Sequence, residues 1–165
     1  MASRNVNTGP TTPATRALDA AGVSYEGLPY EHDPSVTSYG DEAAQALGLD
    51  PSHVFKTLVV SLDSGSFGVA VVPVSTTADL KAVAAGLGAK KCRLAEPRDV
   101  ERLTGYVLGG VSPVGTRTAL ATVVDASAEA LATVYVSGGR RGFDIGLAPA
   151  DLVENVHGRF APIAG

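Results

Sequence analysis

Apolar positions along the chain recur with helix-like and strand-like periods in turn, which predicts a series of short elements. Helices are expected where a capping residue or proline precedes an apolar stripe and a glycine follows it. Strands are expected where apolar runs lie between turn residues. The expected helices cover residues 12–22, 41–48, 78–87, 97–103 and 149–156. The expected strands cover residues 23–30, 54–60, 67–73, 92–94, 120–124, 133–137 and 143–147, with tight turns at 63–66 and 138–142.

The order of these elements defines the expected fold class. Adjacent strands joined by tight turns, with helices between groups of strands, predict an α+β fold with a mixed sheet rather than strict βαβ alternation. The chain has 165 residues and shows no internal repeat and no domain boundary. We therefore expect one domain over residues 12–165, preceded by a loose, flexible tail at residues 1–11.

Lys56 interrupts the apolar strand pattern of residues 54–60. With a period of two, it shares one face with three apolar residues, while Phe55, Thr57 and Val59 occupy the other face. Both faces are mainly apolar, as in a strand that is covered on both sides. Because an unpaired buried charge is costly, Lys56 requires an anionic or strongly polar partner. That partner is either an internal carboxylate, the commoner case for a lysine judged alone, or a ligand phosphate or ester.

Composition and charge exclude several classes of function. The net charge of −4 argues against a generally basic coat for nucleic acid, although a local basic patch is compatible with it. The single cysteine, Cys92, cannot form an internal disulfide, which fits a reducing compartment. The three histidines lie far apart without ligand spacing, so we expect no metal and no cofactor. The polar N-terminus and the lack of a long apolar run indicate no signal peptide and no membrane span, so the cytoplasm is expected.

Three further segments carry candidate chemistry. The first runs from Tyr30-Glu31-His32-Asp33-Pro34 to Ser38-Tyr39-Gly40-Asp41-Glu42-Ala43-Ala44. The second is Thr104-Gly105-Tyr106 with Gly109-Gly110-Val111-Ser112-Pro113-Val114-Gly115, and the third is Ser137-Gly138-Gly139-Arg140-Arg141-Gly142 followed by Asp144. The second segment approaches a phosphate-binding loop, but Thr116-Arg117 replaces the Lys-Ser/Thr pair, so nucleotide hydrolysis is rejected. Its glycines still let backbone N–H groups approach a ligand oxygen, although most Gly-Gly pairs simply form turns.

Together with Phe55-Lys56-Thr57-Leu58, these segments resemble the YbaK-type Cys-tRNA(Pro) deacylases of the bacterial prolyl-tRNA editing-domain superfamily. The motifs fall in the family's order and spacing, and the resemblance runs from Thr12-Pro13-Ala14 to about Val153. It implies a mixed, partly barrel-like sheet flanked by helices. It also implies a trans-acting editing enzyme that removes cysteine wrongly attached to tRNA(Pro).

The resemblance also implies roles for individual residues. The lysine matching Lys56 is the residue most tied to activity and holds the 3′-terminal adenosine and phosphate end of the tRNA. The glycines matching Gly109 and Gly110 face the aminoacyl ester. The implied substrate-binding residues are Tyr30, Tyr39, Thr57, Ser112, Ser137, Gly138 and Asp144.

In the chemistry that the resemblance implies, the substrate's own thiol attacks its ester carbonyl and cyclises. The sequence agrees, because it presents no convincing Ser/His/Asp or Cys/His arrangement. An enzyme whose substrate carries the nucleophile needs only positioning and charge stabilisation.

Several of these residues have simpler interpretations. Tyr30 and Tyr39 could be half-buried aromatics whose hydroxyls reach water. Neighbouring loop side chains rarely face each other, so His32 beside Asp33 is interpreted as structural rather than as a catalytic dyad. Asp144 could pair with Arg140 or Arg141. Cys92 has basic neighbours that could lower its thiol pKa, but the strand pattern favours a core position.

Basic residues outside the pocket motifs form a candidate patch for tRNA phosphates. Its members are Lys90, Lys91, Arg117, Arg140 and Arg141. For each of them, ordinary solvated surface charge is the alternative.

Two other functions are compatible with the sequence. The same fold could hydrolyse Ala-tRNA(Pro) with a bound water, as related editing domains do. A non-catalytic module could instead bind tRNA ends or a synthetase, which leaves prolyl-tRNA synthetase as a possible partner beside the aminoacyl-tRNA itself.

Overall fold

The computed structural model describes residues 6–7 and 9–165, and these form five α-helices, one 3-10 helix and nine strands. The helices are α1 (Pro13–Ala21), α2 (Tyr39–Leu47), α3 (Leu80–Gly86), α4 (Pro97–Thr104), η1 (Ala126–Ala130) and α5 (Pro149–Asn155). The strands are β1 (Val6–Asn7), β2 (Glu26–Pro29), β3 (Phe55–Leu62), β4 (Phe67–Pro73), β5 (Cys92–Leu94), β6 (Ala121–Asp125), β7 (Val134–Arg140), β8 (Phe143–Leu147) and β9 (Arg159–Ala161). Within the expected N-terminal tail, residues 1–5 and 8 lie outside the described residues.

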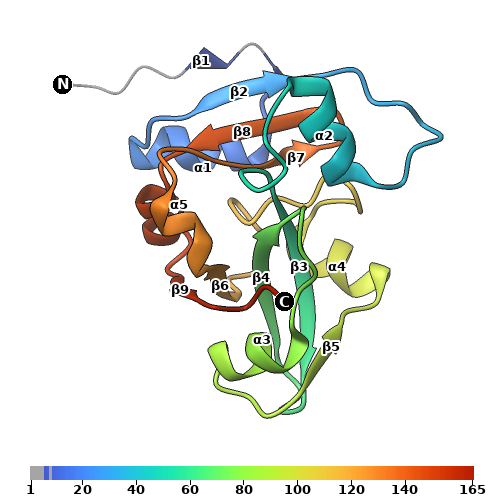
Figure 1. Cartoon of the computed structure of the whole chain (residues 1–165), viewed down its shortest axis with the longest axis vertical. Helices are drawn as coiled ribbons and strands as arrows, with labels where there is room; N and C mark the ends of the chain where they lie inside the picture. The colour runs from blue at the N-terminus through green and yellow to red at the C-terminus, as the bar shows by residue number, and fades with distance from the viewer. Residues whose placement is uncertain (1–5, 8) are drawn as a thin grey trace.

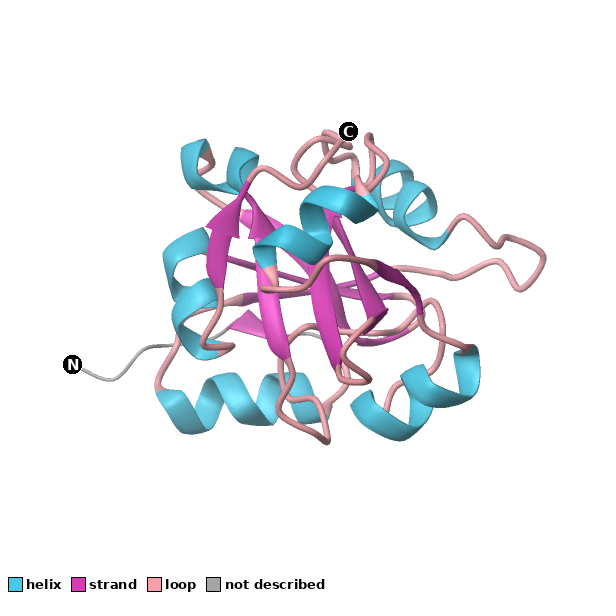
Figure 2. Cartoon of the chain, turned by 90° about the horizontal axis from the view of Figure 1, so that it is seen from below, coloured by secondary structure: helices cyan, strands magenta, loops and turns pink. Residues whose placement is uncertain are grey.

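The strands form two mixed sheets with helices on their outer faces (Figures 1 and 2). The four-stranded sheet has the order β1-β2-β8-β7, and the five-stranded sheet has the order β5-β3-β4-β6-β9. The β3–β4 and β7–β8 pairs are antiparallel, whereas β4–β6 and β6–β9 are parallel. The prediction of an α+β fold with mixed strand pairing is confirmed.

The two sheets meet where β3 begins. Val54 forms a parallel bridge with Tyr135 of β7, and the Tyr135 N–H donates to the His53 carbonyl at 3.0 Å. In Figure 1 this junction lies near the top of the long β3–β4 ribbon, below the β2–β8–β7 sheet. The start of β3, which carries Lys56, is therefore placed against the other sheet.

Two apolar clusters cover the opposite faces of β3, as the apolar residues on both of its faces predict. Phe55 and Val59 belong to the larger cluster, which includes core residues of both sheets and of α1. Val60 belongs to the second cluster, together with Val83 of α3 and Ile163 near the C-terminal end. Burial of both faces makes β3 a rigid support for the side chains at its start.

The helix boundaries follow the local capping chemistry. Thr12 caps α1 through a reciprocal capping box with Thr15, and Gly22 ends the helix in the left-handed conformation at φ 68°. The second helix begins at Tyr39, two residues before the expected Asp41, which places the Tyr39 side chain on its first turn.

Several strand boundaries differ from the sequence prediction, and β1 lies within the expected N-terminal tail, where it pairs in parallel with β2. β7 continues through the expected turn to Arg140, with a register shift between Ser137 and Arg140. β9 was not expected, because its three residues pair in parallel with the distant β6, and no local pattern encodes that contact. Among the residues that the structure describes, no helix has both the length and the apolar character needed to cross a membrane.

Candidate active site

A pocket of about 410 Å³ opens at the junction of the two sheets. Its walls come from the start of β3, the first turn of α2, the 107–111 loop and the facing strands β7 and β8. Seven of the candidate residues named from the sequence line it. They are Tyr30, Tyr39, Lys56, Thr57, Gly109, Ser137 and Asp144.

Lys56 is half-buried and lies on the pocket wall. Its Nζ donates to the Thr76 carbonyl at 3.0 Å, and no carboxylate of the described residues lies within ion-pair distance of it. An ammonium has three donors, so at least two face away from this bond. Of the two partners considered from the sequence, the internal carboxylate does not occur among the described residues. The ammonium is thus available to a ligand anion.

Asp144 is the buried acid of the pocket. It is 5% exposed, and it lies opposite Ser137 in the β7–β8 register. Within the described part of the chain, its carboxyl makes no ion pair or side-chain hydrogen bond, so the alternative of a pairing with Arg140 or Arg141 does not occur. Burial raises its pKa to about 7, because desolvation disfavours the charged form. Burial and then the charge of Asp144 raise the pKa of Tyr30 to about 12.

The raised pKa of Asp144 predicts a loss of stability as pH rises. The folded protein keeps this proton up to about pH 7, whereas the unfolded chain releases it near its ordinary pKa of 3.8. Between these values the folded state binds more protons, so rising pH favours unfolding. Relative to Asp144→Asn, the free energy of unfolding of the wild type should fall by up to ~1.4 kcal/mol per pH unit. Urea unfolding of both proteins between about pH 4 and about pH 7 measures this difference, and parallel stability curves would contradict the assignment.

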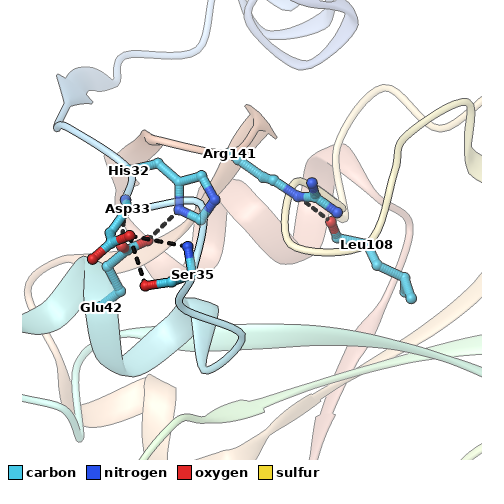
Figure 3. Close-up of polar contacts among 6 residues, drawn as sticks. All are labelled: His32, Asp33, Ser35, Glu42, Leu108 and Arg141. Carbon is cyan, nitrogen blue, oxygen red and sulfur yellow. Dashed lines mark hydrogen bonds and ion pairs between the residues drawn. The ribbon is translucent and has the colours of Figure 1, made fainter.

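Tyr39 is held in place by three neighbours. Its ring lies 5.8 Å from the His32 ring, and the Arg141 guanidinium lies 5.1 Å from its centroid. The Arg141 Nε also donates to the Leu108 carbonyl at 2.7 Å, which ties the β7–β8 hairpin to the 107–111 loop (Figure 3). A side chain at Gly109 would meet the Tyr39 ring at 2.6 Å. The wall formed by Tyr39 therefore depends on contacts from three segments.

His32 connects the loop that precedes α2 to the helix itself. Its Nδ1 lies 2.6 Å from Glu42 Oε1, and the Asp33 N–H donates to Glu42 Oε2 at 2.9 Å (Figure 3). The Asp33 carboxylate accepts from the N–H and the hydroxyl of Ser35. His32 and Asp33 form no dyad, which agrees with the structural interpretation. Glu42 was not identified as a partner from the sequence, because the contact spans ten residues of loop and helix.

Replacing Gly109 with alanine should deform this wall. Gly109 has φ 87°, so any side chain is strained there, and a Cβ would also displace the Tyr39 ring. Gly65 is a matched control, because it has φ 90° and a Cβ added there would meet no atom within 4 Å. We expect Gly65→Ala to cost only the backbone strain of about 1–2 kcal/mol. Thermal unfolding should show a larger loss for Gly109→Ala, and equal losses would contradict the Tyr39 contact.

Two hydroxyl groups on the wall have unused hydrogen-bonding capacity. Thr57 Oγ1 is buried and has no partner among the described residues. Ser137 Oγ accepts from the Gly139 N–H at 3.2 Å, and its own proton has no acceptor in the same part of the chain. The Ser137 hydroxyl can therefore donate to a ligand in the pocket, whereas Thr57 Oγ1 is a buried polar atom without a partner among the described residues.

Three of the candidate residues lie outside the pocket lining. Gly110 packs against the backbone of Arg140, where a Cβ would come within 2.7 Å of its Cα. Ser112 is fully buried, and its Oγ accepts from the Val114 N–H at 3.2 Å. The Gly138 carbonyl accepts from Thr12 Oγ1 at 2.6 Å. These contacts hold the two loops that carry Gly109 and Ser137.

The candidate phosphate patch is divided in space. Arg140 and Arg141 lie on the hairpin beside the pocket, whereas Lys90 and Lys91 precede β5, which pairs with the far end of β3. Six residues of strand separate Lys56 from the far end of β3, a span of roughly 20 Å. Arg117 lies elsewhere, and its N–H donates to the Thr104 carbonyl at the end of α4. Only the hairpin arginines adjoin the pocket.

Cys92 is only partly buried, so it lies at the edge of the core rather than inside it as its strand pattern favours. It packs against the second apolar cluster, and its Sγ donates to the Leu80 carbonyl at 3.1 Å. Burial raises the pKa of its thiol, so the lowered pKa considered from its basic neighbours does not occur. No group of three or more His, Cys, Asp or Glu residues suited to a metal ion occurs in the described ranges 6–7 and 9–165.

The two-sheet fold is the one found in aminoacyl-tRNA editing domains. The model of the family described as "Aminoacyl-tRNA editing domain" matches residues 33–154, and the chain belongs to this family. Over 152 residues it is 33% identical to a candidate Cys-tRNA(Pro)/Cys-tRNA(Cys) deacylase, EbsC of Enterococcus faecalis (strain ATCC 700802 / V583). That similarity covers 92% of each chain.

Solved structures show the same fold. The hypothetical protein APE2540 matches with a TM-score of 0.83 and 29% identity, over 93% of this chain and 100% of that chain. A candidate trans-editing enzyme for prolyl tRNA synthetase matches with a TM-score of 0.79 and 27% identity, over 95% of this chain and 99% of that one.

Proposed function

We propose that this protein deacylates Cys-tRNA(Pro) in trans, with the thiol of the misattached cysteine as the nucleophile. The observation that carries the proposal is the combination of a lysine ammonium that has no carboxylate partner among the described residues with a pocket whose described lining contains no histidine and no cysteine. The similarity to a relative named for Cys-tRNA(Pro) and Cys-tRNA(Cys) supports cysteine as the substrate side chain.

In this proposal the pocket binds and orients the end of the tRNA. The Lys56 ammonium attracts the 3′-terminal phosphate, as a point charge on a rigid strand can. The backbone of Gly109 approaches the ester, because the absence of a side chain leaves room beside Tyr39. The geometry then holds the cysteine so that its sulfur lies near its own carbonyl carbon.

The proposed reaction needs no nucleophile from the protein. The deprotonated sulfur attacks the ester carbonyl, the ester C–O bond breaks, and the ribose oxygen leaves and takes up a proton. The products are a cyclic cysteine thioester and free tRNA. The hydroxyls in the lining belong to Thr37, Ser38, Thr57 and Ser137. A hydroxyl nucleophile is ordinarily activated by an adjacent base such as histidine, and the described residues of the lining offer no histidine.

The test is a comparison of three substrates with the purified protein. We expect rapid release of cysteine from Cys-tRNA(Pro), with slow release of alanine from Ala-tRNA(Pro) and of proline from Pro-tRNA(Pro). Faster reaction with Ala-tRNA(Pro) would instead support the water-mediated enzyme. Binding of all three without release would support the non-catalytic module. Repeating the assay with added prolyl-tRNA synthetase tests whether that enzyme is a partner.

A further inference from the structure

The pocket lining carries the Lys56 ammonium and the carboxyl groups of Asp41, which is exposed, and Asp144, which is buried; the ammonium pairs with neither. Lys56 lies on β3 and bonds only to the Thr76 carbonyl among the described residues, while Asp144 lies on β8. No ion pair joins them, and the other described side chains supply no cation to Asp144. A ligand that satisfies both groups must carry an anion and a cation.

The cation has to reach a confined position. Asp144 is nearly fully buried in the central part of the β2–β8–β7 sheet, opposite Leu28 on one side and Ser137 on the other. Its open approach is the pocket, which it lines together with Tyr30 and Ser137. A compact ammonium on a small substituent fits this position.

We propose that Asp144 binds the free α-amino group of the aminoacyl ester, so that the site accepts aminoacyl-tRNA and rejects tRNA whose amino acid lacks a free amine. The inference rests on the proposed function, because it assumes that Lys56 takes the phosphate end of the same ligand. Asp144 then determines specificity for the amino group, and it takes no part in bond breaking.

The protonation state of Asp144 supplies a signature of this contact. In the empty pocket, burial keeps the carboxyl protonated below about pH 7. A bound ammonium favours the carboxylate, since an opposite charge at close range lowers the pKa of an acid. Binding near pH 6 should therefore release up to about one proton to the buffer.

The first experiment removes the amino group without adding bulk. 3-Mercaptopropionyl-tRNA(Pro) keeps the ester and the thiol of Cys-tRNA(Pro) but lacks the amine. For the wild type, kcat/KM should favour the cysteinyl ester, and Asp144→Asn should reduce that preference roughly 10- to 100-fold, the size of one hydrogen bond to a charged group. Comparing the ratio in both proteins cancels the different reactivity of the two esters. A preference unchanged by the substitution would overturn the proposal.

A matched variant separates this effect from a general loss of acidity. Glu129 is an exposed acid on η1, remote from the pocket lining. Glu129→Gln should leave both rates and their ratio at wild-type values. An equal fall of both rates in Asp144→Asn would mean a structural role for Asp144 and would also overturn the proposal.

The second experiment does not depend on catalysis. Its probes are 3′-deoxy-3′-(cysteinylamino)adenosine 5′-phosphate and the analogue that lacks the amine, measured by calorimetry in two buffers near pH 6. We expect tighter binding and proton release only for the amino probe, and we expect both to disappear in Asp144→Asn. The same result from a protein that does not deacylate Cys-tRNA(Pro) would reject the proposed function and retain the Asp144 site. Equal binding of both probes by the wild type would reject the Asp144 site, whether or not the variant folds.

Discussion

Replacing Lys56 with alanine should abolish deacylation of Cys-tRNA(Pro) while leaving the fold intact. The ammonium is the one basic group among the described residues that line the pocket, and loss of one preorganised electrostatic partner costs about 10²–10³ in kcat. The structural cost should be small, because Lys56 makes one hydrogen bond to a backbone carbonyl and no ion pair among the described residues. A hydrogen bond that involves a charged group contributes about 1.5–3 kcal/mol. Single-turnover deacylation and thermal unfolding measure the two effects separately.

A matched lysine makes this experiment decisive. Lys81 is exposed on α3, and Lys81→Ala should leave both activity and stability near the wild-type values. Near-normal activity in Lys56→Ala would show that the site is wrongly assigned. Unfolding of Lys56→Ala would show a hidden structural pair, since loss of one partner from a buried pair costs about 3–5 kcal/mol. Lys56→Arg keeps the charge on a longer, planar group, so partial activity is expected.

The sequence could predict Lys56 because its signal is local. A charge within an alternating apolar strand is visible in seven residues, and the structure confirms that both faces of that strand are covered. The hairpin from β3 to β4 was predictable for the same reason, since turn residues separate two apolar runs. Local patterns of this kind account for the helices and most of the strands.

Contacts between distant segments were not predictable. The Lys56 ammonium bonds to a backbone carbonyl twenty residues away, and a carbonyl carries no sequence signal. The three neighbours of Tyr39, which are His32, Gly109 and Arg141, come from separate segments, so no short stretch of sequence contains all of these contacts. The proposed phosphate patch groups residues by charge alone, and the structure places the two lysines before β5 at the end of β3 opposite to Lys56.

The tertiary structure also decides the role of single residues such as Asp144. From the sequence, Asp144 was expected to line the pocket, with pairing to a neighbouring arginine as the alternative, because strand periodicity does not give the depth of a side chain. The β8 strand lies between β2 and β7, and Asp144 is buried there. Its chemistry follows from this burial rather than from its sequence neighbours.

Ser-tRNA(Pro) should be deacylated far more slowly than Cys-tRNA(Pro). The two side chains are nearly isosteric, so selective binding alone should separate them by only ~10–200-fold. A thiol with a pKa of ~8.5 supplies a few per cent of strongly nucleophilic thiolate near neutral pH, whereas a hydroxyl supplies essentially none. A rate ratio well above the binding limit, measured in single-turnover assays, is the expected result. Comparable rates on the two substrates would rule out attack by the substrate's own side chain.

The pH dependence of the rate with Cys-tRNA(Pro) should distinguish the ionisation of the substrate thiol from that of Asp144. With the chemical step limiting, the rate should rise with pH until the thiol of the bound cysteine is ionised, near its ordinary pKa of ~8.5. The pKa of Asp144 is lower than that of the thiol, at about 7 in the empty pocket, and this ionisation is abolished in Asp144→Asn. The variant should therefore keep the upper rise while losing any dependence near neutral pH. A rate that stays flat from about pH 7 to about pH 9 in both proteins would instead indicate hydrolysis by water.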